Sequence, residues 1–161
     1  MKQDPMQTPS TNSQRAESNH LAAYLFHQGT NFRAYEYLGL HFEGERVIFR
    51  TWAPNADYVS VCGDFNGWNP ETDPMTRITE GGVWELKLPA ERASVGQCYK
   101  YCIRNHGREV LKADPYGFSM QRPPETASQI CDISGYTWRD AGWLNYRKKH
   151  FNRANYLSQP L

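Results

Sequence analysis

The sequence lacks long hydrophobic runs and any excess of one charge sign. No run of about 18 apolar residues occurs in its 161 residues, so no transmembrane helix is predicted. The first residues, Met1–Pro5, do not carry the apolar segment of a signal peptide. Eighteen basic residues balance seventeen acidic ones, and the net charge is only +1. This balance indicates neither a nucleic acid nor a membrane as a partner.

Cysteine patterns typical of a disulfide framework or a zinc site are also missing. Cys98 and Cys102 fall four residues apart on one predicted strand, which separates them by roughly 13 Å. Cα atoms more than about 7 Å apart cannot be bridged by a disulfide. We therefore predict free thiols and a reducing, cytoplasmic location. Phosphate-binding glycine loops, G-x-S-x-G and H-E-x-x-H are absent as well, so no cofactor or metal is predicted.

A catalytic site is not indicated either. Four carboxylates gather around the middle of the chain, and a glycosidase would need two of them facing each other across a rigid site. All four lie in predicted turns, where Asp and Asn commonly accept hydrogen bonds from backbone N–H groups. We interpret them as structural: Asp57, Asp64, Glu71 and Asp73. No catalytic residue is predicted.

What the sequence does contain is a series of short segments in which apolar side chains alternate with polar ones. Gly, Pro and Asn separate them, and no segment between them is long enough for a helical crossover. This pattern predicts an all-β fold, an antiparallel β-sandwich. The predicted strands cover residues 45–53, 58–65, 83–88, 97–104, 109–112 and 127–133.

A different pattern precedes the strands. Residues 1–19 are polar, which predicts a disordered tail. Residues 20–40 read as a short helical extension in two pieces. The first piece is capped by Ser18 or Asn19 and ended by Gly29, and the second covers residues 31–38.

The other boundaries follow from the strands. The sandwich is predicted to span residues 41–134 and a linker to span 135–161. The basic run at residues 147–150 reads as part of this solvated linker.

Residues 58–68 form the central segment, a strand that ends in the turn Asn66-Gly67 and presents Trp68. This ring is either an anchor folded into the core or an exposed platform on which a sugar or a base can stack. Lys100 lies beside Tyr99 and can donate to sugar hydroxyls, although an ordinary surface lysine is the alternative. Two other tryptophans, Trp52 and Trp84, lie inside strands and are assigned to the core or the sheet surface.

Three short blocks resemble the family 48 carbohydrate-binding module: Gly-Asp-Phe-Asn-Gly-Trp at 63–68, Tyr-Lys-Tyr at 99–101 and Lys-Ala-Asp-Pro-Tyr-Gly at 112–117. Two further blocks, within 25–39 and at 122–128, look like the amino-terminal region of glycogen branching enzymes. Together the resemblance covers about residues 21–143.

The resemblance implies an immunoglobulin-like sandwich that precedes a catalytic (β/α)8 barrel. In that family the barrel cuts an α-1,4-glucan and transfers it to a 6-hydroxyl, which is a glycosyltransferase reaction. Its carboxylates would lie beyond residue 161. The implied partners are this barrel and an α-1,4-glucan such as glycogen or a maltooligosaccharide. The alternatives are a module that only packs on the barrel, a free-standing glycogen-sensing module, and the sandwich of a debranching or trehalose-releasing relative.

The resemblance also implies glucan-binding residues. Trp68 aligns with a stacking tryptophan of related modules and Lys100 with their hydroxyl-donating lysine. A second stacking tryptophan of the glycogen-sensing modules falls near Leu111, where this chain has no ring. Asn66, Tyr99 and Leu111 complete the candidate glucan contacts.

Overall fold

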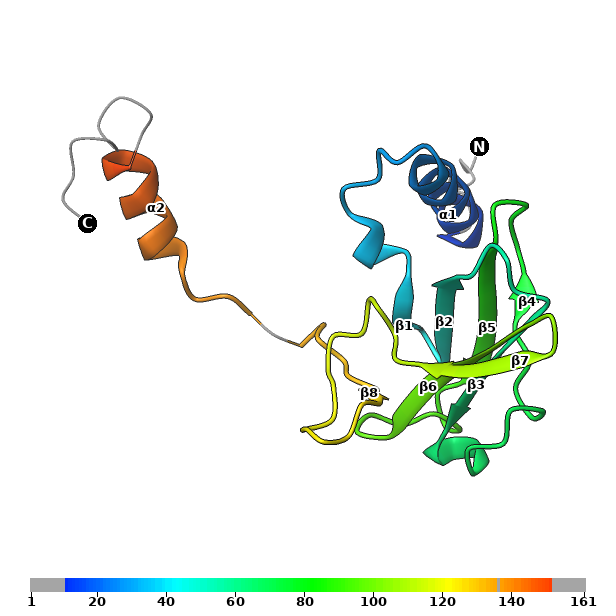
Figure 1. Ribbon diagram of the computed structural model, residues 1–161. Coiled ribbons are helices and arrows are strands. Elements are labelled where there is room, and N and C mark those ends of the chain that lie inside the picture. The colour runs from blue at the N-terminus through cyan, green and yellow to red at the C-terminus, as the bar shows by residue number, and fades with distance from the viewer. Residues whose placement is uncertain (1–10, 136, 152–161) are drawn as a thin grey trace, which may run out of the picture.

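The computed structural model describes residues 11–135 and 137–151. Two antiparallel sheets pack face to face in an immunoglobulin-like β-sandwich, as predicted (Figure 1). One sheet has the order β1-β2-β5-β4, with the strands Gly39–Glu43, Arg46–Trp52, Val83–Pro89 and Thr76–Arg77. The other has the order β3-β6-β7, with Tyr58–Gly63, Cys98–Asn105 and Arg108–Lys112, and β8 (Ser128–Gln129) pairs with β6.

The core lies between the sheets and follows from the period of two in each strand. On β2, Val47 and Phe49 point inward, and on β6 Tyr99 and Tyr101 do the same. The turn Asn105-His106-Gly107 joins β6 to β7 with positive φ angles of 47° at His106 and 75° at Gly107. The prediction of this hairpin is therefore confirmed.

Helix α1 (Thr11–His27) covers the outer face of the β1-β2-β5-β4 sheet. Ala23 packs with Tyr37, Leu38 and Val83 in a second small apolar cluster. The helix ends as predicted at Gly29, where φ is +71° and Thr30 N–H donates to Leu25 C=O.

Parts of the predicted helical extension are wrong. The helix starts at Thr11, so the disordered tail predicted for 1–19 is wrong for residues 11–19, and residues 1–10 lie outside the described part of the chain. Ser18 and Asn19 lie within the helix and do not cap it. The second predicted helix is only a 3-10 turn, η1 (Ala34–Glu36). It ends there because Tyr37 and Leu38 pack against Ala23 of α1 and Gly39 starts β1.

Four further elements differ from their predictions. The sequence pattern missed the edge strands β1 and β4, since each has few residues in clear alternation. The predicted closing strand 127–133 is shortened to β8. The predicted linker contains helix α2 (Ala141–His150), and its basic run forms the last turn, where positive charge is favourable next to the helix C-terminus. Figure 1 shows α2 apart from the sandwich.

Candidate functional site

The segment that follows β3 holds Trp68 at the rim of the β3-β6-β7 sheet. A 3-10 turn, η2 (Asp64–Asn66), leads to Gly67 and Trp68, both in the left-handed backbone region with φ of 62° and 61°. Trp68 N–H donates to Gly63 C=O at 2.9 Å, which closes the turn. The tryptophan is 39% exposed. Of the two alternatives for Trp68, this favours a surface ring over an anchor in the core.

Asp64 fixes the indole in this position. Its Oδ1 accepts a hydrogen bond from Trp68 Nε1 at 2.9 Å, while Oδ2 accepts one from Cys98 N–H at 2.7 Å. One carboxylate thus joins the ring to the first residue of β6. The sequence offers a signal for this arrangement, an aspartate four residues before the tryptophan, but the link to Cys98 depends on the pairing of β3 with β6.

Lys100 lies at the same end of the β3-β6 pair. It is directly opposite Cys62, and the neighbouring pair joins Tyr99 to Gly63, the residue that Trp68 contacts. Its side chain is half-buried on the outer face of the sheet, and Nζ donates to Thr126 Oγ1 at 2.8 Å. An ammonium group has three N–H donors, so Lys100 can donate to a ligand while it keeps this bond.

The next strand brings Leu111 to this face. Leu111 lies on β7 opposite Cys102 of β6, and it is 51% exposed. An aliphatic side chain here can contact a ligand but cannot stack as an aromatic ring does. The structure therefore places an ammonium group and an aliphatic side chain on the face that β3, β6 and β7 form, Lys100 and Leu111, and an exposed indole at its rim, Trp68.

The structure corrects two of the predicted glucan contacts. Tyr99 is 1% exposed, and its hydroxyl donates to Asp114 Oδ2 at 2.7 Å inside the core, so its ring cannot reach a glucan. Asn66 is used by its own turn: Oδ1 accepts from Gly63 N–H, and Nδ2 donates to Val61 C=O and to Asp73 Oδ2. Asn66 shapes the site without presenting a free amide to a ligand.

Asp114 has a structural role beneath this face. Tyr101 also donates to Asp114 Oδ2, at 3.0 Å, and Ser128 Oγ accepts from the Asp114 N–H. Burial raises the pKa of Asp114 above its ordinary value, although the hydrogen bonds from both tyrosines oppose the shift. Burial and the Asp114 charge likewise raise the pKa of Tyr99 and of Tyr101.

The four carboxylates predicted to be structural all have partners within the fold. Asp57 accepts from His106 N–H, and Asp73 pairs with Arg92 at 3.0 Å. Glu71 pairs with Arg104, and Asp64 holds Trp68 as described. Within residues 11–135 and 137–151, no group of three or more His, Cys, Asp or Glu side chains could hold a metal ion.

All four cysteines are free thiols, as predicted. Cys62 and Cys102 are buried under the outer face of the β3-β6-β7 sheet. Burial raises the pKa of Cys102 to about 12, and the neighbouring Cys62 adds to the shift. Such a thiol stays protonated at neutral pH and is a poor nucleophile.

The remaining strand tryptophans lie where they were predicted, one in the core and one on a sheet surface. Trp84 is buried, and its Nε1 donates to Ala53 C=O at 3.0 Å. Trp52 is 51% exposed and meets the edge of Phe26 from α1. None of the helices in the described part of the chain is both long and apolar enough to cross a membrane.

Residues 37–117 match the family described as carbohydrate-binding module 48 (isoamylase N-terminal domain). The chain belongs to this family. The matched residues include the whole of β2 to β7, and with them Trp68, Lys100 and Leu111.

Known proteins similar to this module are several times longer. The 1,4-alpha-glucan branching enzyme GlgB of Methylococcus capsulatus is 46% identical over 131 residues, which cover 78% of this chain and 17% of the relative. That of Jannaschia sp. is 43% identical over 136 residues, with 84% and 19% covered. The module thus spans about a fifth of the length of these curated relatives.

Solved structures agree on the fold. A mutant pullulanase from Paenibacillus barengoltzii, complexed with maltotetraose, matches with a TM-score of 0.53 and 26% sequence identity. The match covers 67% of this chain and 16% of the pullulanase chain.

Proposed function

We propose that this chain is the amino-terminal α-glucan-binding module of a 1,4-α-glucan branching enzyme. The similarity to branching enzymes over most of the chain supports the choice of parent. The parent would be a cytoplasmic glycosyltransferase that forms α-1,6 branches in glycogen, and a (β/α)8 barrel outside these residues would carry its catalytic carboxylates. The module would bind glycogen or a maltooligosaccharide and would need neither a cofactor nor a metal.

The observation that carries this proposal is the conformation of Trp68. A bulky residue with a positive φ is an outlier, and such a conformation costs about 1–3 kcal/mol. Strained residues of this kind cluster at ligand sites. Here the strain keeps an indole 39% exposed and holds it by its Nε1 hydrogen bond to Asp64. The apolar face of a glucose unit can stack on such a ring.

Lys100 and Leu111 complete the proposed site. The Lys100 ammonium group would donate to glucose hydroxyls next to the stacked ring, and Leu111 would contact the following sugar unit. Since Leu111 offers no second aromatic platform, we expect weak binding, with a dissociation constant of about 1 mM, or about 4 kcal/mol of binding free energy.

Calorimetric titration of the 161-residue chain with maltoheptaose tests the proposal. Trp68→Ala should raise the dissociation constant about tenfold or more, which corresponds to about 1.4 kcal/mol or more of lost binding free energy. Lys100→Ala should have a smaller effect in the same direction. The matched control is Trp143→Ala, which removes an indole that is 54% exposed on α2, away from the site.

Circular dichroism must show that each variant is folded. Parent-like affinity in folded Trp68→Ala would refute the site. An absence of heat in the parent at millimolar sugar would refute glucan binding altogether.

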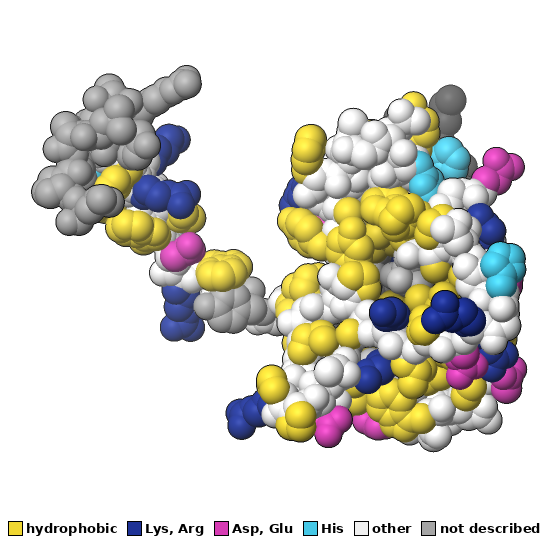
Figure 2. All heavy atoms as spheres, viewed as in Figure 1, with side chains coloured by type: hydrophobic (Ala, Val, Ile, Leu, Met, Phe, Trp, Pro, Cys, Tyr) yellow, Lys and Arg dark blue, Asp and Glu magenta, His cyan; other side chains and the backbone are white. Residues whose placement is uncertain are grey.

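One observation favours a second candidate function, a module that only packs on the rest of its enzyme. Helix α2 exposes a cluster of rings in which Trp143 stacks on Tyr146 at 5.9 Å and lies 6.2 Å from Phe151. Figure 2 shows hydrophobic and basic side chains next to each other on this helix. The absence of heat described above would leave this function standing.

A further inference from the structure

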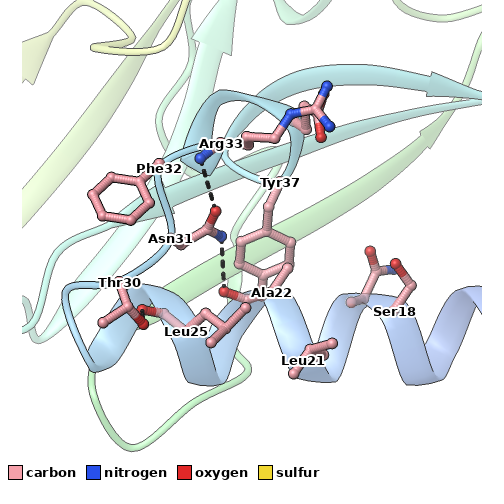
Figure 3. A pocket seen from close by; sticks show the side chains of 11 residues that line it. Ser18, Leu21, Ala22, Leu25, Thr30, Asn31, Phe32, Arg33 and Tyr37 are labelled. Atoms are coloured by element: carbon pink, nitrogen blue, oxygen red, sulfur yellow. Dashed lines mark hydrogen bonds and ion pairs between the residues drawn. The ribbon is translucent and has the colours of Figure 1, made fainter.

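A cavity lies between helix α1 and the segment of residues 30–37, on the side of the molecule that carries the β1-β2-β5-β4 sheet. Its volume is about 420 Å³, within the range of about 300–1,000 Å³ that is usual for small-molecule sites. Lys100 lies on the other sheet and Trp68 on the segment that follows its strand β3, and neither lines the cavity. Figure 3 shows the cavity with the side chains of both segments around it.

Asn31 joins the two walls of the cavity and also shapes its own wall. Asn31 Nδ2 donates to Ala22 C=O at 3.1 Å, and Asn31 Oδ1 accepts from Arg33 N–H at 3.0 Å (Figure 3). Tyr37 is 3% exposed and anchors the segment in the small apolar cluster under α1. The cavity is therefore built before any ligand arrives, which reduces the entropy that binding must overcome.

Apolar side chains at its margin are unusually exposed. Phe32 is 93% exposed and Leu21 is 56% exposed. Neither side chain belongs to the two apolar clusters of the described residues, so packing does not account for the position of the Phe32 ring. Large apolar groups that gather around a cavity mark a surface that interacts with a ligand or a partner.

The polar part of the lining has no net charge. Arg33 and Glu36 form an ion pair at 2.6 Å, one turn apart on the same wall of the cavity. Ser18 and Asn19 add neutral polar groups from α1. Since the guanidinium charge is compensated, the lining does not favour a phosphate or another anion. A planar guanidinium and a carboxylate next to each other can donate to and accept from neighbouring hydroxyls of one neutral ligand.

We propose that this cavity is a second carbohydrate site, which takes one or two glucose units of an α-glucan. Phe32 is the stacking ring, and the Arg33–Glu36 pair binds the hydroxyl groups. The ligand class rests on the proposed function of the module, while the location and residues of the site do not. The two sites share no residue, so two branches of one glycogen particle can occupy them together and strengthen binding by multivalency.

NMR titration of the ¹⁵N-labelled 161-residue chain with maltoheptaose reports on both sites at once. We expect the backbone amides of residues 31–33 and the indole N–H of Trp68 to shift with separate dissociation constants. Phe32→Ala should raise the constant of the first set at least tenfold and leave the second unchanged. Trp68→Ala should leave the constant of the first set unchanged. It should raise the constant reported by the backbone amides of residues 66–69, which remain when the indole N–H is removed. The matched control is Tyr24→Ala, which removes a ring that is 56% exposed on α1 but does not line the cavity.

The outcomes separate this proposal from the function on which it rests. Shifts at Trp68 with none at residues 31–33 would overturn the second site and leave the module a glucan binder. Shifts at 31–33 that persist unchanged in Phe32→Ala would also overturn it. The absence of any shift at either site would refute both proposals. Because Phe32 is 93% exposed, its replacement should leave the fold intact.

Discussion

The two sheets of the sandwich share one core but differ on their outer faces. On β2, the outward-facing Ile48 and Arg50 are 1% and 2% exposed, because α1 and residues 30–38 lie over this sheet. On the β3-β6-β7 sheet, the outward-facing Leu111 is 51% exposed and Lys100 is half-buried. A covered outer face has to satisfy its polar groups internally, whereas an open face can present them to a ligand.

The covered face meets this requirement with an ion network. Arg50 Nε donates to Glu85 Oε2 at 2.7 Å, and Nη1 donates to Tyr37 C=O at 3.3 Å. The guanidinium also lies over the Tyr37 ring, 5.0 Å from its centroid. This one side chain therefore connects β2 and β5 to the segment that leads from α1 into the sandwich.

Arg50→Ala should test the covered face most severely. The substitution leaves Glu85 with only the more exposed Lys87 as a partner and removes the buried donor to Tyr37 C=O. Because breaking a buried ion pair is costly, we expect the free energy of unfolding to fall by about 3–5 kcal/mol. Urea unfolding followed by circular dichroism measures this loss. The control is Lys87→Ala, which removes the more exposed partner of Glu85 and should cost less than about 1 kcal/mol. Equal losses of unfolding free energy in the two variants would contradict the expectation that the buried Arg50 contributes more to stability than the exposed Lys87.

Asp114→Asn tests the network between the sheets, where Tyr101 Oη contacts both Asp114 and the Arg50 C=O. Burial raises the pKa of Asp114 in the folded state, so folding favours the protonated acid. The stabilisation is complete below the unfolded-state value near 3.8 and is lost as the pH rises through the raised pKa.

Since Asn cannot ionise, the stability of Asp114→Asn relative to the parent should increase with pH over this window. The expected change is about 1.4 kcal/mol for each unit by which the pKa is raised. Urea unfolding of both proteins at a series of pH values measures the difference. A difference that does not vary with pH would contradict the raised pKa.

Trp68→Gly should have the smallest effect on stability and tests the open face. Glycine adopts a positive φ without strain, and this relief offsets part of the packing energy that the indole supplies. We expect the free energy of unfolding to stay within about 1 kcal/mol of the parent, while maltoheptaose binding is abolished. Calorimetric titration and urea unfolding of one sample measure both. A fall of about 3–5 kcal/mol would instead show that the ring is a core anchor.

Much of the fold could be predicted because its signals are local. Alternation predicts β2, β5 and β6 nearly to the residue, since each strand buries one face in the same core. The hairpin at His106-Gly107 and the helix end at Gly29 follow from residues that tolerate positive φ. Strand β1 was missed although it pairs with the adjacent strand β2, because it is short and has few residues in clear alternation.

The candidate site divides in the same way. The types and spacing of residues indicated Trp68 and Lys100 as ligand contacts, and this remains a prediction until binding is measured. The alternation also placed Tyr99 on the same side of its strand as Tyr101, which is the core side, so its burial could have been inferred. That the Asn66 amide is already hydrogen-bonded could not have been inferred from the sequence, since its contact with Asp73 is formed only in the folded chain.

The sequence by itself determined the sandwich, its free thiols and the presence of a tryptophan in a turn after the third strand. These depend on alternation, spacing and turn chemistry, which act over a few residues. Only the tertiary structure decided which face is covered, how Asp64 holds the indole against β6, and where α1 and Phe32 enclose a cavity. The first two arrangements join segments that are far apart in sequence, and the cavity depends on the packing of α1 and Tyr37 against Val83 of β5.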